Sequence, residues 1–573
     1  MSASAGRSAS AVRRVGADLG SRYPWLVDAY RSLRNPKWAL DLHRDLTATR
    51  ANAAFTRGIP PGHAGETGET ALLALYRDNV YETKLALTLA TGLRLRGLSP
   101  VVSMPTNRTA RTRRYAAAFG IDDVIAQDRL EIPAALTDEV DAASRRFLES
   151  PLDFEAVREW SFRGVSVGNH VLSTLIRVTF DGSPDLGIET NRELVASILD
   201  DVLLNTVRAE ILLDRVGPCV VLVEEANYGV NGPLVDVTVN RGIDVVQTVG
   251  LWREDALMSK RLTKTTRRVD ALSVAPETLD RFEHTPLTPQ ESKDLDADFA
   301  DRYGGRWELG QQYQPDTVAM TGEQIATLLE LDPAKPTAVI FAHVLWDASL
   351  FFGVDLFENY ADWLVQSVGA AVANDRVNWV VKAHPSNVFR AAHGDVGGES
   401  SEVLLVRERF PQLPAHVKLV LPETRVSTLS LYQYADYGVT VRGTPGLEIA
   451  CFGKPAFTAG TGTYAGHGFT YDSRSRQEFL ERLASIHEYR RAPDEMTERA
   501  RRYAWLYFTR RPWRTRSFNL VFEFAERGWH PVDRNVVFTA RSVADVHRMR
   551  DLDEWAAWAT TSSDADFVAE TQG

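Results

Sequence analysis

Short apolar runs alternate with longer amphipathic stretches along the first half of the chain. The runs at 99–104, 218–224 and 243–248 have the length and composition of buried strands. The stretches at 71–97 and 138–214 instead space their apolar residues as helices do. Strands separated by helices favour a parallel, doubly wound sheet, because parallel neighbours need a crossover connection. The first half is therefore predicted to form a Rossmann-like α/β domain.

The alternation restarts after a polar stretch at 255–336, in which acidic residues repeat and no strand-like run occurs. We interpret that stretch as a connector. In the second half, strands and helices are again predicted to alternate. The predicted strands are 337–343, 377–382, 417–421, 437–441 and 455–458, and the predicted helices are 357–373, 427–434 and 446–452. This pattern predicts a second Rossmann-like domain that faces the first across a cleft.

These patterns divide the chain into five parts. The predicted parts are a partly disordered and partly helical extension at 1–60, an acceptor-side domain at 61–255, the connector at 256–335, a nucleotide-binding domain at 336–490, and a helical tail at 491–573 that packs back on the core. The residues at 1–11 are rich in Ser, Ala and Gly and are predicted to be disordered.

Composition narrows the class of protein. With 573 residues, 44% apolar and 25% charged, the chain is globular and long enough for several domains. A net charge of -11 argues against a general nucleic-acid-binding protein. The two cysteines, Cys219 and Cys451, are too few for a disulfide framework, which favours the cytoplasm. No apolar run reaches the roughly 20 residues needed to span a bilayer.

Two turns that follow predicted strands carry candidate phosphate ligands. Lys382 and His384 end one strand, and Pro385 keeps the imidazole on a turn. The turn at 442–448 reads Arg-Gly-Thr-Pro-Gly-Leu-Glu and leads into a short helix, whose free N–H groups suit a diphosphate. The alternatives are a structural histidine and an ordinary capped helix start. We assign donor binding to Lys382, His384, Arg442, Gly443, Thr444, Gly446 and Glu448.

Candidate acid and base groups follow the other strands. Glu224 and Glu225 end the strand at 218–224, where a carboxylate can deprotonate an acceptor hydroxyl. The alternative is a solvated strand end or a helix cap. Asp347 and His343 follow the strand at 337–343 and are further candidates for substrate contact. We therefore group Glu224, Glu225 and Asp347 with His384 as candidate catalytic residues.

Metal and membrane signals are weaker. Asp294 and Asp296 spell Asp-x-Asp, but they lie in an acidic, helix-like run, so no metal site is predicted. A divalent metal bound only through donor phosphates stays open. The aromatic and basic residues at 505–516 suit a peripheral contact with an anionic membrane or glycan. The alternative is that these rings pack a closing helix on the core.

Several of these segments occur together in a known family. They are His384-Pro385, 435–437, 443–455, 460–464, and 341–347 with 363–364. In this order they resemble the carboxy-terminal half of bacterial capsule polysaccharide biosynthesis glycosyltransferases, which are related to the capsule Kdo transferases. The resemblance covers roughly 217–468. It implies the GT-B architecture, with the donor bound mainly by the second domain and its phosphate held by His384 and Thr444.

The resemblance also implies a function. It is the transfer of a sugar from a CMP- or UDP-linked donor to a capsular or other surface polysaccharide, or to its lipid-linked primer. The expected partners are the nucleotide-sugar donor and a glycan or glycolipid acceptor, and the expected location is the cytoplasm, including the inner face of the plasma membrane. The alternatives are a polyol-phosphate transferase, a sugar-nucleotide epimerase, or a non-catalytic glycan-binding or export-associated subunit.

Overall fold

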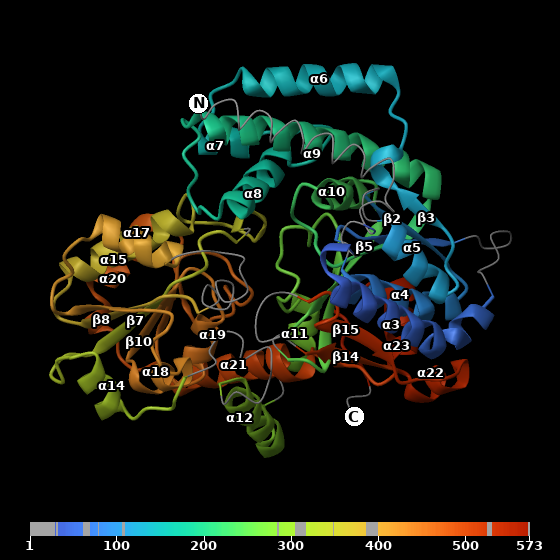
Figure 1. Ribbon diagram of the computed structural model, residues 1–573. Helices are drawn as coiled ribbons and strands as arrows, with labels where there is room; N and C mark the ends of the chain where they lie inside the picture. The colour runs from blue at the N-terminus through green and yellow to red at the C-terminus, as the bar shows by residue number, and fades with distance from the viewer. Residues whose placement is uncertain are drawn as a thin grey trace.

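The computed structural model describes residues 29, 33–60, 69–77, 79–105, 109–251, 253–283, 286–303, 317–347, 349–385, 399–523 and 530–570. The described chain forms two α/β units that lie side by side, and the C-terminal segment runs from one to the other (Figure 1). We call the unit built on the N-terminal sheet the first unit, and the other the second unit. The predicted disordered start at 1–11 lies outside the described residues.

The first unit is built on a sheet whose order, within the described residues, is β13-β6-β5-β4-β1-β2-β3. Its strands are β1 (Thr70–Ala74), β2 (Ser99–Met104), β3 (Val124–Ala126), β4 (Pro218–Val223), β5 (Asp244–Gly250), β6 (Ala256–Leu262) and β13 (Trp513–Arg514). Strands β1 to β5 are parallel, whereas β6 is antiparallel to β5 and β13 to β6. The strand order reverses between β1 and β4, which is where ligands bind in doubly wound sheets.

The second unit repeats this plan. Among the described residues its sheet has the order β12-β11-β10-β7-β8-β9, and every neighbouring pair is parallel. The strands are β7 (Thr337–Phe341), β8 (Asn378–Lys382), β9 (Val417–Val420), β10 (Tyr437–Thr440), β11 (Ala456–Thr458) and β12 (Tyr471–Asp472). Here the order reverses between β7 and β10. The predicted fold class, two Rossmann-like α/β units, is confirmed by the two sheets.

Helices cover both faces of each sheet. In the first unit, one face carries α3 (Pro36–Asn52), α4 (Val80–Leu95), α5 (Thr109–Ala118) and α23 (Asp551–Thr561), and the other α6 (Ala134–Leu148), α7 (Phe154–Arg158), α8 (Val167–Thr179), α9 (Glu189–Val216) and α10 (Gly232–Asn240). Alternate residues of one strand enter different cores: Leu73 packs on the first face and Leu72 on the second.

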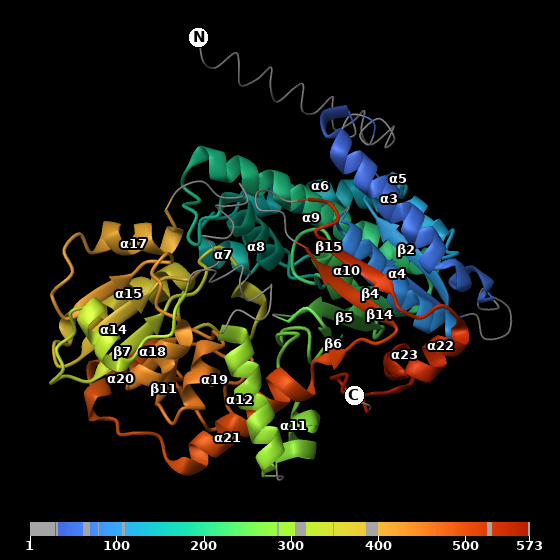
Figure 2. The same cartoon turned by 60° about the horizontal axis from the view of Figure 1, so that its bottom comes forward.

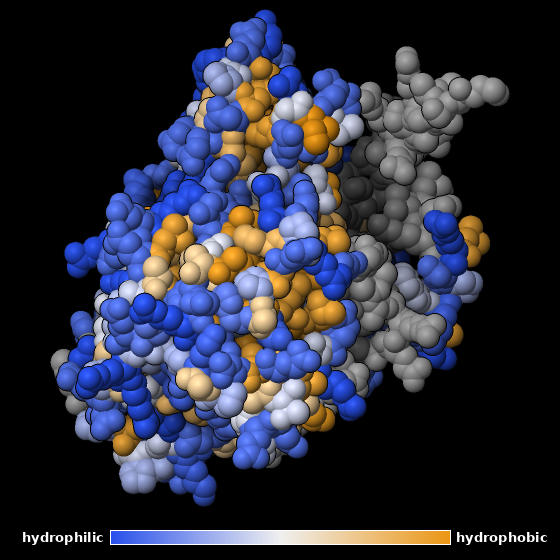
Figure 3. Space-filling model, turned by 90° about the vertical axis from the view of Figure 1, so that its left-hand side faces the viewer, coloured by the Kyte–Doolittle hydropathy of each residue, from blue (hydrophilic) through white to orange (hydrophobic). Residues whose placement is uncertain are grey.

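The second unit has the same layering. One face carries α15 (Tyr360–Ala373), α17 (Ser401–Arg409) and α20 (Arg476–Ala484), and the other α12 (Pro289–Tyr303), α18 (Thr428–Tyr434), α19 (Pro445–Ala450) and α21 (Asp494–Trp505). The side of this unit seen in Figure 3 is mostly hydrophilic, with apolar residues gathered near its middle. Such exposed apolar side chains are ordinary on folded proteins.

The predicted strands at 99–104, 218–224 and 243–248, and all five predicted in the second half, are present. Two stretches of this pattern were assigned wrongly. The apolar start of the stretch at 71–97 is strand β1, and only its later part is helix α4. The stretch at 255–336 contains β6. A strand buried on both faces is uniformly apolar and lacks alternation, which explains the first error. The second arises because β6 holds Lys260 and Arg261 in buried ion pairs.

The C-terminal segment connects the units. Helix α21 packs on α19 of the second unit, then β13 joins the first sheet and α23 packs on α4 (Figure 2). The segment also contains the hairpin of β14 (Phe518–Phe522) and β15 (Arg534–Phe538) and helix α22 (Val543–Met549), so it is not purely helical as predicted. Among the residues that the structure describes, no helix combines the length and the apolar character that a bilayer span requires.

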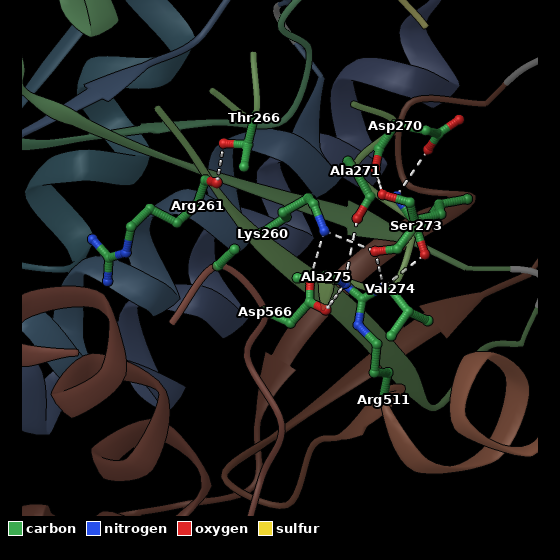
Figure 4. A network of polar contacts seen from close by, with 12 residues as sticks. Lys260, Arg261, Thr266, Asp270, Ala271, Ser273, Val274, Ala275, Arg511 and Asp566 are labelled. Atoms are coloured by element: carbon green, nitrogen blue, oxygen red, sulfur yellow. Dashed lines mark hydrogen bonds and ion pairs between the residues drawn. The ribbon is translucent and has the colours of Figure 1, made fainter. Parts of the chain in front are cut away.

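A buried ionic network fixes this connection to the first sheet (Figure 4). Asp566 pairs with Lys260 of β6 at 2.6 Å and with Arg511 at 3.0 Å, and its other oxygen accepts from the amide of Ala275 at 2.6 Å. Arg511 also donates to the carbonyls of Leu272 and Ser273, each at 2.6 Å. Because Arg511 and the rings of Tyr507, Phe508 and Trp513 are buried, these side chains pack in the core.

Candidate functional site

The carboxyl ends of the two sheets meet at the loop that follows β7. Val344, Trp346 and Leu350 of this loop belong to the hydrophobic core of the first unit, packed with α8 and α9. The hydroxyl of Tyr228, in the loop after β4, lies 3.5 Å from Oδ1 of Asp347. We call the two places where the strand order reverses, between β1 and β4 and between β7 and β10, the first and second switch points. The loops at these two points are therefore in contact. The predicted residues Asp347 and Glu225 lie on opposite sides of that contact.

Basic side chains gather at the carboxyl ends of β7 and β8. Lys382 is the last residue of β8 and is 4% exposed, and the rings of His343 and His384 lie 6.2 Å apart. We call Lys382, His343 and His384 the basic cluster. Burial alone lowers the pKa of Lys382 to about 8. Burial, together with His343 and Lys382, lowers the pKa of His384 to about 3.

Lys382 has no anionic partner among the described residues. A buried ammonium group without a counter-charge is destabilised, and that destabilisation is what lowers its pKa. An anion that entered here would reverse the effect on Lys382 and favour the protonated forms of both histidines. The amide of His384 donates to Oε1 of the buried Glu402 at 3.1 Å, which fixes the turn that carries the imidazole.

The turn after β10 is held from several sides. Arg442 is buried, pairs with Asp355 and donates to the carbonyl of Phe352. Burial lowers its pKa to about 10. Thr444 lies at the N-cap of α19 but makes no capping hydrogen bond, and its Oγ1 is 3.4 Å from Nη2 of Arg302. The guanidinium of Arg442 therefore lies against protein groups, while Thr444 lies at the start of the helix.

Two predicted residues of this turn have clear packing partners. A Cβ at Gly446 would overlap Oη of Tyr464, which donates to the carbonyl of Gly443 at 2.6 Å. Glu448 is fully buried; it pairs with Arg302 at 2.6 Å and accepts from Tyr432 at 2.5 Å and from Tyr303. The contact of Tyr464 fixes the backbone of the turn, and the contacts of Glu448 join α19 to α12.

The adjacent carboxylates Glu224 and Glu225 have different surroundings. Oε1 of Glu225 accepts from the amides of Ala226 and Asn227 at 2.8 and 2.9 Å. Burial raises the pKa of Glu225 to about 7 against those hydrogen bonds, and the charge of Asp347 adds to the increase. Burial also raises the pKa of Glu224, which shares its environment with Glu82. Glu225 therefore faces the second unit, and Glu224 faces the start of α4.

Sequence reasoning missed the residues that follow β1. Glu224 and Glu225 are surrounded by Tyr76, Arg77 and Glu82. The charges of the two glutamates raise the pKa of Tyr76 and of Arg77, and the charge of Glu224 raises that of Glu82. The sequence pattern does not indicate these three neighbours, because it predicts helix where strand β1 lies. A strand ending at Ala74, placed beside β4 at the switch point, would have pointed directly to Tyr76 and Arg77.

The Asp-x-Asp pair lies on α12, away from both switch points. Asp294 accepts from Gln290 at 2.7 Å, and Asp296 pairs with Arg501 at 2.8 Å. Within the described part of the chain, no group of three or more His, Cys, Asp or Glu side chains is arranged to hold a metal ion.

Comparisons with known proteins give only distant likenesses. No protein-family model and no curated protein matches the chain. Among solved structures, it is similar to the β-Kdo 2,4-transferase of KpsC from Thermosulfurimonas dismutans (14% identity, 50% of this chain and 79% of that chain, TM-score 0.30). It is similar to the β-Kdo 2,7-transferase of the same protein (16%, 52% and 79%, 0.29).

A third likeness is to the UDP-GlcNAc 2-epimerase from Neisseria meningitidis, solved with UDP-GlcNAc (10% identity, 76% of this chain and 97% of that chain, TM-score 0.23). At these identities and TM-scores the likenesses carry no argument about substrate or reaction. The fold assignment rests on the strand order and the parallel pairing of the two sheets.

Proposed function

We propose that the chain is a glycosyltransferase that moves a sugar from a nucleotide-sugar donor to a glycan or glycolipid acceptor. The observation that carries the proposal is Lys382, a buried cation at the second switch point without a described anionic partner, beside His343 and His384. A phosphate group of a donor would supply the missing charge. The Thr444 turn, after the neighbouring strand β10, supports the same location.

In this proposal each sheet serves one substrate. Lys382, His384 and the backbone of Gly443, Thr444 and Gly446 bind the donor phosphates, and Arg442 and Glu448 hold the turn in shape. Lys382 stabilises the negative charge that develops on the departing phosphate, which is a large term in group transfer. The resemblance of the sequence motifs within 217–468 to those of capsule transferases supports a CMP- or UDP-linked donor and a surface polysaccharide or lipid-linked primer as acceptor, met in the cytoplasm or at the inner membrane face.

Glu225 is the proposed base on the acceptor side. A general base works best when its pKa is near the working pH, and that of Glu225 is about 7. Two loop amides fix its carboxylate, and Asp347 faces it from the second unit. Glu225 accepts the proton of the acceptor hydroxyl as that oxygen attacks the anomeric carbon, and the nucleotide leaves with the electrons of the bond that breaks.

The donor site is tested by calorimetry with UDP, CMP, CDP, GDP and ADP. We expect one nucleotide to bind, and Lys382→Met and Thr444→Ala to weaken it by about tenfold or more, since each removes a contact to phosphate. Lys418→Met, on β9 and paired with Glu330, is the matched control. Binding of none of the nucleotides to a folded sample would overturn the proposal and favour a non-catalytic subunit.

A sugar-nucleotide epimerase is the second candidate. It is favoured by the effect of the Asp347 charge on Glu225 from the other unit, because two carboxyl groups beside one bound sugar can remove and return a proton on it. Incubation with donors labelled in the sugar separates the candidates. Label in a polymer or lipid supports transfer, and an isomeric nucleotide sugar supports epimerisation. Label in a polyol-phosphate product would instead indicate polyol-phosphate transfer.

A further inference from the structure

A buried histidine lies directly behind the loop that carries Glu225. His170, on α8, has no exposed surface. Its Nδ1 lies 2.8 Å from the carbonyl oxygen of Asn227, and its Nε2 lies 2.9 Å from Oδ2 of Asp236 on α10. A carbonyl oxygen and a carboxylate oxygen are both acceptors, so each ring nitrogen must donate a proton. The contacts therefore require the doubly protonated imidazolium form.

Arg267 completes the same network from the other side. Its Nε donates to Oδ1 of Asp236 at 2.6 Å, so this carboxylate is shared between two cations. Burial would raise the pKa of Asp236, but the charges of Arg267 and His170 hold it well below its usual range. Asp236 is the charged group that contacts the imidazole, and Arg267 binds the other oxygen of the same carboxylate. The network is thus a buried carboxylate between two positive charges.

Together, His170 and Arg267 hold the backbone of the loop. His170 binds the carbonyl of Asn227, and Arg267 donates to the carbonyl of Ala226 at 2.8 Å and to Oδ1 of Asn227 at 3.1 Å. The amides of Ala226 and Asn227 point the other way and donate to Glu225. The two amides that orient the Glu225 carboxylate therefore belong to residues whose carbonyl oxygens are bound by Arg267, at Ala226, and by His170, at Asn227.

The network also reaches the second unit. Phe351, from the loop after β7, stacks on the His170 ring with centroids 4.8 Å apart, and the guanidinium of Arg267 lies 5.0 Å from the centre of the same phenyl ring. A phenyl face attracts positive charge, so this contact depends on the charge of the network. Gly232, at the start of α10, leaves room for the imidazole, because a Cβ there would overlap it.

We propose that His170, held as an imidazolium, forms with Asp236 and Arg267 a positioning device that orients Glu225 and ties its loop to Phe351 of the second unit. The charge state of His170 follows from the contacts alone, whereas its effect on turnover rests on the proposed function. His170 is a positioning residue and not a catalytic one, because Glu225 and its loop lie between it and any acceptor.

The charge of His170 is tested first by NMR of the full chain labelled with nitrogen-15 in its histidine rings. We expect one doubly protonated imidazolium signal at pH 7 that is absent from His170→Gln. If that variant does not fold, the milder Phe351→Leu identifies the signal by shifting it. A neutral tautomer for His170 at pH 7 would overturn the proposal, whatever the enzyme acts on.

The positioning role is tested by kinetics with the donor that calorimetry identifies. We expect His170→Gln to lower kcat about 10- to 100-fold with the nucleotide Kd unchanged, since misplacement of a reacting group costs rate rather than donor affinity. The acidic limb of the pH profile should also move to higher pH, because a loosened loop donates less well to Glu225. His416→Gln, which removes a ring bonded to the carbonyl of Ala371, is the control. An unchanged kcat and pH limb would overturn the role, even where the nucleotide binds.

Discussion

Buried charged side chains at the carboxyl ends of the sheets differ chiefly in what faces them. Glu448 and Asp236 each meet positive charges and hydrogen-bond donors, and they hold structure together. Lys382 meets no described anion, whereas Glu225 is affected by the like charge of Asp347 and by the opposite charge of Arg77. The unmatched charge of Lys382 and the raised pKa of Glu225 both cost stability, and perturbed groups of this kind cluster at functional sites.

Glu225 should therefore give a pH dependence with a defined sign. Its pKa is about 7 in the folded chain, above the ordinary glutamate value, so the folded state holds the proton more tightly. Stability should fall as the pH rises from the unfolded to the folded pKa, and activity should rise as Glu225 loses its proton near pH 7.

We expect Glu225→Gln to be more stable than the native chain at pH 8, by a margin that shrinks towards pH 5. Turnover at pH 8 should fall about 10²- to 10⁴-fold, as for loss of a general base. Urea denaturation and rate measurements across this range check both effects, with the exposed Glu131→Gln as control. A stability difference that does not change with pH would contradict the assigned pKa.

At the scale of elements, the parts most faithfully predicted were those with a strong local signal. The eight strands bounded by turns or helices were found, as was the turn at 442–448. Strand β1 was missed because its burial on both faces removes the period-2 alternation. Strand β6 was missed because its cations are neutralised by Asp566, far away in sequence, and by Asp244 on the neighbouring strand β5. The same limit applies to the site: Glu225 was predicted from a strand end, whereas His170 and Arg267 reach it only through the packing of α8 and the connector.

The turn after β10 provides a test at this scale. Gly446→Ala should destabilise the second unit by about 1–3 kcal/mol, because the new methyl group displaces Tyr464 from the carbonyl of Gly443. Tyr464→Phe removes the hydroxyl that clashes, so the double variant should lose less than the sum of the two single variants. Urea denaturation of the four proteins measures the coupling. Strict additivity would show that Tyr464 does not constrain position 446.

At the scale of the molecule, the two units are joined by more than a linker. The loop after β7 contributes Trp346 to the core of the first unit, the connector enters the second unit beyond Ala275, and the C-terminal segment returns at Arg511. The connector and the C-terminal segment, which both pass between the units, meet at Asp566 (Figure 4). The relative placement of the two switch points therefore depends on a few buried contacts between distant segments.

Asp566→Asn should expose how much the assembly depends on that carboxylate. Lys260 and Arg511 would remain buried without the carboxylate that pairs with both, and breaking a buried pair in this way costs about 3–5 kcal/mol. Although burial opposes it, the charges of Arg511 and Lys260 lower the pKa of Asp566, so its stabilising effect should be present above the usual aspartate pKa and lost as the pH falls through the lowered value.

Asp564→Asn, which removes an exposed partner of Arg281, should cost less than about 1 kcal/mol. Urea denaturation followed by tryptophan fluorescence measures both, and equal losses would mean that the network at Asp566 does not hold the crossings together.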